Sequence, residues 1–102
     1  MLKRALRSAT ARESYAAELR LLQRAQAAYA EGDLAGALAL AAEHRRRFPN
    51  GRLAEEREAL RVRSLAASGR GTDARSAVGA FARRFPHSVL LPRLQETSAM
   101  AE

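Results

Sequence analysis

The sequence contains no cysteine and no tryptophan, and aromatic residues make up only 5% of its 102 residues. Without cysteine the chain can form no disulfide, no thiolate metal site and no catalytic thiol. No run of apolar residues approaches the length that spans a bilayer. The basic segment 1–7 is not followed by an apolar stretch, so it does not resemble a secretory signal. We therefore expect a cytoplasmic protein, or a periplasmic one if a signal or anchor lies outside this sequence.

Ala, Leu and Arg dominate the composition, whereas β-branched residues are scarce. This bias favours helix over strand, and a chain of this length forms one domain. The predicted fold class is all-α. The net charge is +7, and residues 1–12 carry Lys3, Arg4, Arg7 and Arg12 with no acidic residue. We expect residues 1–12 to form a basic N-terminal arm or a helix extension, followed by a helical domain over residues 13–102.

The chain repeats itself once, because Arg46–Pro49 returns as Arg83–Pro86 after 37 residues. Positions that match at the same offset are Gly32 with Gly69, Ala37 with Ala74, and Leu53 with Leu90. A fixed period of this size indicates stacked helix pairs that present a surface for binding.

Apolar periodicity and helix-end signals predict five helices. We expect them at about 13–30, 34–47, 53–68, from Thr72 to 84, and 89–100. Gly32 ends the first, because glycine accepts the left-handed conformation common at helix C-termini. Asp33, Thr72 and Ser88 are the predicted N-caps of the second, fourth and fifth helices. Pro49 and Pro86 end the second and fourth.

The order Gly32-Asp33, Ala37, Phe48-Pro49, repeated as Gly69, Ala74, Phe85-Pro86, resembles the tetratricopeptide repeat, and in particular a bacterial subgroup with aromatic-Pro junctions. The resemblance covers about residues 15–98. It implies a solenoid of α-α hairpins, with repeats at about 15–51 and 52–88 and a capping helix at about 89–100. It also implies a scaffold for protein partners. About three repeats are usually needed for stability, so we expect a homo-oligomer or a larger parent protein.

In that family the first helix of each pair lines a groove that holds a partner segment. Carried over to this sequence, the groove residues are Leu22, Gln26, Tyr29, Ala59, Arg63 and Ala66. Such a groove would suit an extended or helical segment that bears a carboxylate. In the alternative interpretation, Leu22 and Tyr29 pack against a capping or dimer helix instead.

The arginines gather at the ends of the second helices, and a possible polyanion edge consists of Arg45, Arg46, Arg47, Arg52, Arg83 and Arg84. Such an edge could bind nucleic acid or an anionic membrane surface. Compensation of the helix dipole explains the same clusters without a ligand. No aromatic platforms interleave with them, and no nucleic-acid reading motif is present.

The sequence offers no arrangement typical of catalysis. His44 and His87 lack a carboxylate or second histidine at metal-ligand spacing. His44 falls on the inward side of its helix, so we expect a buried neutral imidazole there. We therefore predict that the protein is not an enzyme and uses no metal or cofactor.

Overall fold

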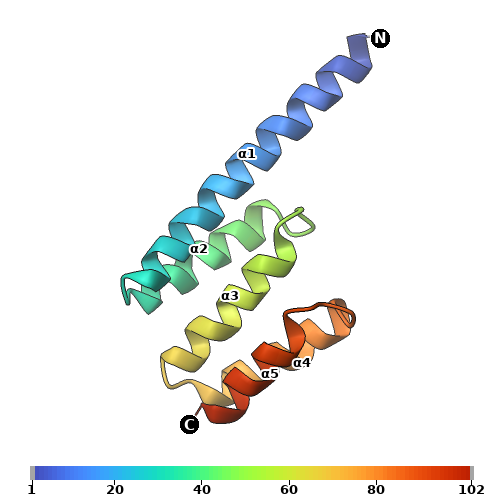
Figure 1. The fold of residues 1–102 in the computed structure, drawn as a ribbon. Helices are drawn as coiled ribbons and strands as arrows, with labels where there is room; N and C mark the ends of the chain where they lie inside the picture. The colour runs from blue at the N-terminus through green and yellow to red at the C-terminus, as the bar shows by residue number, and fades with distance from the viewer. Residues whose placement is uncertain (1, 102) are drawn as a thin grey trace.

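The computed structural model describes residues 2–101, and five α-helices account for most of them. They are α1 (Leu2–Ala30), α2 (Leu34–Arg47), α3 (Ala54–Ala67), α4 (Gly71–Arg84) and α5 (Leu91–Met100). Each helix packs against the next along the chain, and α5 also packs against α3. The helices form successive hairpins, and the N-terminal part of α1 extends well beyond them (Figure 1).

The all-α prediction is confirmed, and the part of the chain that the structure describes contains no strand. The bounds predicted for α2 are those observed. The first helix is longer than predicted: it begins at Leu2 rather than near residue 13, so the basic arm is a helix extension. The fifth helix is shorter and begins at Leu91 rather than residue 89.

Two glycines make the turns that follow α1 and α3. Gly32 and Gly69 have φ angles of +82° and +77°, which side chains disfavour. After each glycine a backbone N–H reaches back to the preceding helix. Asp33 N donates to the carbonyl of Ala28 at 2.8 Å, and Arg70 N donates to that of Leu65 at 3.0 Å. The two turns are therefore built alike, at the 37-residue offset of the sequence repeat.

The predicted N-caps have different outcomes. Asp33 caps α2, because its Oδ1 accepts from Gly36 N at 2.9 Å. The prediction that Thr72 caps α4 is wrong. Thr72 lies inside this helix, and Arg70, which occupies the N-cap position, makes no side-chain cap hydrogen bond. Ser88 accepts from the N–H of Leu90 at 3.0 Å, but α5 begins later, at Leu91.

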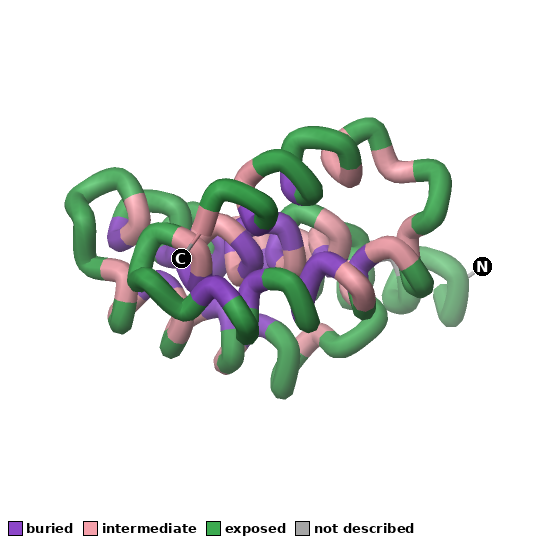
Figure 2. The backbone as a smooth tube through the Cα atoms, turned by 90° about the horizontal axis from the view of Figure 1, so that it is seen from below, coloured by how far each residue is buried: buried purple, intermediate pink, exposed green. Residues whose placement is uncertain are grey.

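Apolar side chains are buried in two clusters. In Figure 2 the buried stretches of the helices, drawn in purple, lie in the interior of the molecule. The larger cluster lies between α3, α4 and α5 and consists of Ala59, Val62, Leu65, Ala74, Ala77, Val78, Phe81 and Leu94. The smaller one joins α1 to α3 through Leu22, Ala25 and Leu60. Ala37 and Ala74 are both fully buried, which allows the helices of each pair to approach closely.

Candidate functional site

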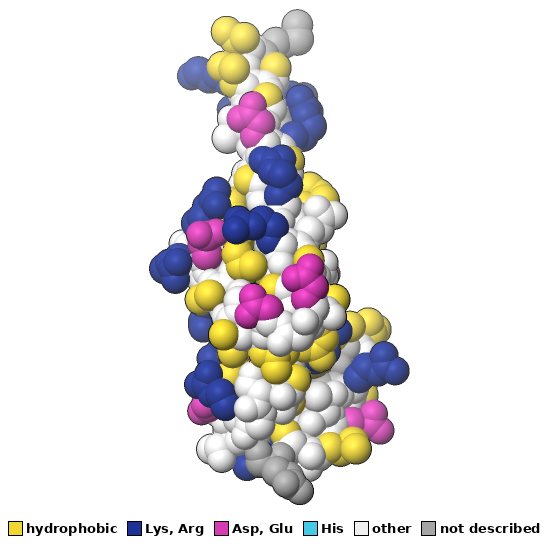
Figure 3. Space-filling view, turned by 90° about the vertical axis from the view of Figure 1, so that its left-hand side faces the viewer, with side chains coloured by type: hydrophobic (Ala, Val, Ile, Leu, Met, Phe, Trp, Pro, Cys, Tyr) yellow, Lys and Arg dark blue, Asp and Glu magenta, His cyan; other side chains and the backbone are white. Residues whose placement is uncertain are grey.

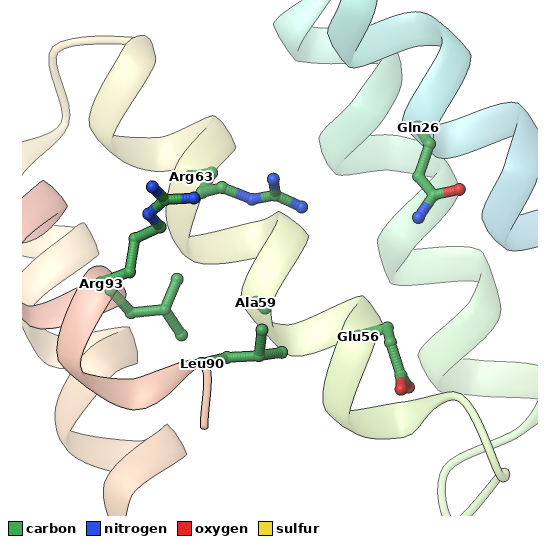
Figure 4. Close-up of a pocket in the computed structure, with 7 residues that line it drawn as sticks. Gln26, Glu56, Ala59, Arg63, Leu90 and Arg93 are labelled. Atoms are coloured by element: carbon green, nitrogen blue, oxygen red, sulfur yellow. The ribbon is translucent and has the colours of Figure 1, made fainter. Parts of the chain in front are cut away.

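A hollow of about 200 Å³ opens between α1, α3 and α5. It is lined by Gln26 of α1, by Glu56, Ala59 and Arg63 of α3, and by Leu90, Arg93 and Leu94 at the start of α5. Figure 4 shows Arg63 and Arg93 on one side of this hollow, with Gln26 and Glu56 on the opposite side. We call it the groove site.

The groove site combines an apolar floor with two cations. Ala59 and Leu94 are buried and supply the floor. Within residues 2–101, neither Arg63 nor Arg93 forms an ion pair. The Nε of Arg63 is buried without a hydrogen-bond partner in that part of the chain, while its guanidinium lies 5.5 Å from the centre of the Tyr29 ring. Arg93 is exposed and Arg63 is partly exposed, so their remaining N–H groups are available to an acceptor from another molecule.

The structure brings together three of the six groove residues predicted from the sequence, namely Gln26, Ala59 and Arg63. Leu22 does not face the groove. It is 3% exposed and packs with Ala25 and with Leu60 of α3, so it is covered by a helix of the array itself and not by a capping or dimer helix.

The other two predicted groove residues lie beside the groove site. Tyr29 is half-buried beneath Arg63, and Ala66 packs against the larger core cluster.

The contribution of α5 to this site was not predicted from the sequence. Leu90, Arg93 and Leu94 were assigned to a helix that only covers the array, yet they form one wall of the hollow. The spacing of Leu90 and Leu94, with a cation between them, indicates a helix face that is partly apolar and partly basic. This pattern could have identified Leu90, Arg93 and Leu94 as candidate site residues. Only the packing of α5 against α3 shows which surface these residues complete.

A second polar group of residues lies beneath the loop between α2 and α3. Glu18 (3% exposed), His44 (0%) and Arg57 (0%) come from three different helices. Arg57 donates from Nη1 to His44 Nδ1 at 3.2 Å and to the carbonyl of Phe48 at 2.9 Å. Its Nε donates to Glu58 Oε2 at 2.6 Å. We call Glu18, His44 and Arg57 the buried polar network.

Glu18 of α1 caps the N-terminus of α3, although the two are about 35 residues apart in the sequence. Its carboxylate accepts from Leu53 N at 2.7 Å and Arg52 N at 3.2 Å, two N–H groups that point out of the α3 N-terminus. Backbone donors at helix N-termini lack partners within the helix, and a carboxylate there is also favoured by the helix dipole. Gly51 permits this approach, because a side chain at that position would collide with the Glu18 carboxylate.

The surroundings of His44 favour its neutral form, as predicted. Burial lowers the pKa of His44 below its usual 6.5, and the Arg57 guanidinium lowers it further, against the opposing effect of Glu18. Because Arg57 donates to Nδ1, the imidazole proton belongs on Nε2. That nitrogen lies 3.4 Å from Glu18 Oε1, close enough for attraction but outside hydrogen-bond geometry. With all three side chains buried, the network holds the loop and offers no atom to a molecule in solvent.

The six arginines of the predicted polyanion edge are all exposed. Several make contacts of their own. Arg52 lies over the Tyr15 ring at 4.6 Å, and Arg47 lies over Phe48 at 5.2 Å. Arg84 donates to the Pro49 carbonyl at 2.8 Å, which ties the end of α4 to the first loop. These arginines therefore take part in packing at the helix ends.

Residues 2–101 contain no group of three or more His, Asp or Glu side chains placed to hold a metal ion. None of the helices described in the structure is both long enough and apolar enough to cross a membrane. Comparison of the chain with protein-family models, with curated proteins and with solved structures finds no match.

Proposed function

We propose that this chain is a non-catalytic protein-interaction module, a tetratricopeptide-like array that holds a segment of a partner protein in the groove site. The observation that carries the proposal is the pair Arg63 and Arg93. Two cations without an acidic partner in residues 2–101 stand at the edge of an apolar floor. Side chains from three helices meet there, as expected of a surface formed by stacking hairpins.

The recurrence of local geometry supports a repeat array. Phe48 N donates to the His44 carbonyl at 2.7 Å, and Phe85 N donates to the Phe81 carbonyl at the same distance. The side chains in these pairs also lie against each other, with ring centres 5.5 Å and 5.1 Å apart. The two hairpins therefore end with the same backbone hydrogen bond and the same kind of ring contact, as expected of two copies of one repeat.

The chemistry of the groove site predicts the partner segment. Arginine guanidinium groups bind carboxylates through charge-assisted hydrogen bonds, and the floor formed by Ala59 and Leu94 favours an aliphatic side chain. A segment that carries acidic and aliphatic residues in alternation would satisfy both. A basic segment would be repelled.

Binding of a polyanion by the six-arginine edge is the alternative from the sequence. Arg47, Arg52 and Arg84 lie against aromatic rings or backbone carbonyls at the helix ends, and Arg63 likewise lies over the ring of Tyr29. We favour the groove site because its two cations adjoin an apolar floor formed by the buried Ala59 and Leu94. The two functions also respond differently to salt, since phosphate binding weakens steeply as ionic strength rises.

A binding assay with short labelled peptides tests the proposal. We expect a Leu/Glu peptide to bind the protein and a Leu/Lys peptide of the same length not to bind. The double variant Arg63→Gln/Arg93→Gln should weaken binding by roughly tenfold or more, because hydrogen bonds to charged groups are among the stronger ones.

The matched control is Arg75→Gln/Arg83→Gln, which removes the same charge from exposed positions on α4. It should bind the Leu/Glu peptide almost as well as the wild type. If the two double variants lost the same amount of peptide affinity, the proposal would be contradicted, because the loss would then follow from the lower net charge and not from the groove site.

A further inference from the structure

The first turns of α1 project from the rest of the protein, as Figure 1 shows. We call residues 2–10 the projecting segment. Leu2 and Leu6 are 74% and 59% exposed, although leucine is usually covered. Within residues 2–101 no other helix covers them. An exposed apolar stripe on a part of a helix that no other helix covers indicates a surface that binds another molecule.

The stripe lies on a side of α1 that the other helices leave exposed. At 3.6 residues per turn, Leu2 and Leu6 fall in line with Glu13, Arg20 and Arg24. All five are exposed, whereas two of the residues that α1 buries, Glu18 and Leu22, lie on the opposite side of the helix, and a third, Leu21, lies next to the stripe on the side of Arg47 of α2. We call the side with Leu2 and Leu6 the outward face of α1. A flat partner could therefore contact this face along its length without touching α3, α4 or α5.

Basic side chains accompany the stripe. Lys3 and Arg12 flank it on either side, and residues 2–12 contain no acidic side chain. Further along the helix, Arg20 and Arg24 of α1 and Arg47 of α2 line a second hollow of about 200 Å³. Seen from the side in Figure 3, Lys and Arg side chains follow the length of the molecule, and apolar atoms cover the tip of the projecting helix.

We propose that the outward face of α1 rests on the surface of an anionic lipid bilayer. Leu2 and Leu6 enter the boundary between headgroups and acyl chains, and the hollow formed by Arg20, Arg24 and Arg47 receives a lipid phosphate. Helices that lie in this boundary combine a narrow apolar side with lysine and arginine, as the projecting segment does. Anionic lipids attract each cation near the surface.

The charges argue against the other occupants of this face. Pairing of two projecting segments from two copies would bring together Lys3, Arg4 and Arg7 of each copy, six cations in all, with only Glu13 of each copy nearby to offset them. A nucleic acid would use the arginines but leave Leu2 and Leu6 in water. A lipid surface is the partner that uses both the apolar and the basic residues.

Sedimentation with lipid vesicles tests the proposal on the complete chain. We expect the protein to sediment with vesicles of phosphatidylcholine and phosphatidylglycerol, but not with vesicles of phosphatidylcholine alone. Leu2→Ser/Leu6→Ser, which keeps the net charge, should lower the binding at physiological salt at least tenfold. Arg20→Gln/Arg24→Gln should lower it roughly thirtyfold, because each cation near an anionic surface contributes roughly a fivefold increase.

The control Arg70→Gln/Arg75→Gln removes two exposed charges at the start of α4, outside both the six-arginine edge and the outward face of α1, and should keep most of the binding. Circular dichroism of every variant shows that the helices remain. Three outcomes overturn the proposal: a loss in the control as large as that in Arg20→Gln/Arg24→Gln, unchanged binding after substitution of the two leucines, or tighter binding to duplex DNA than to the anionic vesicles at the same salt.

Discussion

At the scale of single residues, the buried polar network distinguishes the two repeats. The positions 37 residues after Glu18, His44 and Arg57 are occupied by Glu55, Phe81 and Leu94. In the second repeat, Phe81 and Leu94 are buried in the larger apolar cluster. The same backbone path is therefore stabilised by hydrogen bonds and charge in the first repeat, and by apolar contact in the second.

Glu18 has the largest expected effect on stability among the charged residues. Glu18→Ala leaves the N–H groups of Arg52 and Leu53 without their acceptor in a largely buried place, while Arg57 keeps its ion pair with Glu58. We expect a loss of about 1.5–3 kcal/mol in the free energy of unfolding, measured by urea denaturation. Glu43→Ala is the matched control, since Glu43 is 38% exposed and lies 3.9 Å from Arg47. A loss above about 1 kcal/mol in this control would contradict the distinction between buried and exposed pairs.

His44 makes stability depend on pH. Its pKa is lowered in the folded protein, so below about pH 6.5 the unfolded chain binds more protons than the folded one. We expect this contribution to stability to be fully present well above pH 6.5, the ordinary pKa of histidine, and to decrease as the pH falls through 6.5 towards the lowered pKa of the folded state. Urea denaturation at several pH values measures this. In His44→Gln the decrease over this range should be smaller, and an identical pH profile in that variant would exclude His44 as the cause.

At the scale of helices and turns, the glycines at the ends of α1 and α3 have the same role, and the sequence identified both. Gly32 and Gly69 adopt positive φ angles, and each precedes a backbone hydrogen bond that closes the helix end. The direction of the next helix depends on this turn. The cap that follows differs, because Asp33 accepts from Gly36 N whereas Arg70 caps nothing.

Alanine at either turn glycine should destabilise the protein through the backbone. We expect Gly32→Ala and Gly69→Ala each to cost about 1–2 kcal/mol, because a left-handed conformation is unfavourable for any residue with a Cβ. Nothing lies within 4 Å of a Cβ at either position, so the loss would not come from a collision. Thermal unfolding measures it.

The control for the glycine prediction is Gly79→Ala, inside α4, where a Cβ would meet only Arg83 Nη1 at 3.6 Å. It should be neutral or stabilising by up to about 1 kcal/mol, since alanine is the better helix former. If Gly79→Ala destabilised the protein as much as Gly32→Ala, the conformational explanation would fail.

At the scale of the whole molecule, the protein is elongated, with extents of 55 × 29 × 19 Å. At the C-terminal end of the array, α5 exposes the polar residues Gln95 and Glu96, and the apolar Val89 and Met100 at its two ends are also exposed. The expected association into a homo-oligomer stays a prediction, and light scattering at low and high salt measures the solution mass directly.

Removal of residues 2–10 should leave the stability of the remaining protein nearly unchanged. The projecting segment contributes no buried side chain among those the structure describes, so we expect a difference within about 0.5 kcal/mol in the free energy of unfolding. Leu94→Ala, in the larger cluster, should by contrast cost about 2–5 kcal/mol. A large loss on truncation would show that the projecting segment packs against the hairpins in solution.

Local signals in the sequence determined the class of fold, the repeat, the bounds of α2, the two glycine turns and the inward position of His44. These features depend on residues near one another in the chain: helix periodicity, backbone conformation and capping. Leu22 could not be assigned in this way, because periodicity shows that a residue is on an apolar face but not which helix covers it. Nor does periodicity alone show where a helix without neighbours begins, which is why the start of α1 was missed.

Only the tertiary structure decided which distant residues meet. Glu18 and Leu53 are 35 positions apart in the sequence, and the burial of Arg57 within a run of charged residues has no local signature. The groove site likewise depends on the packing of α5 against α3, which brings Arg93 to Arg63. Burial and electrostatic contact are properties of the packed chain, because they depend on the distance between helices and the exclusion of water rather than on spacing along the sequence.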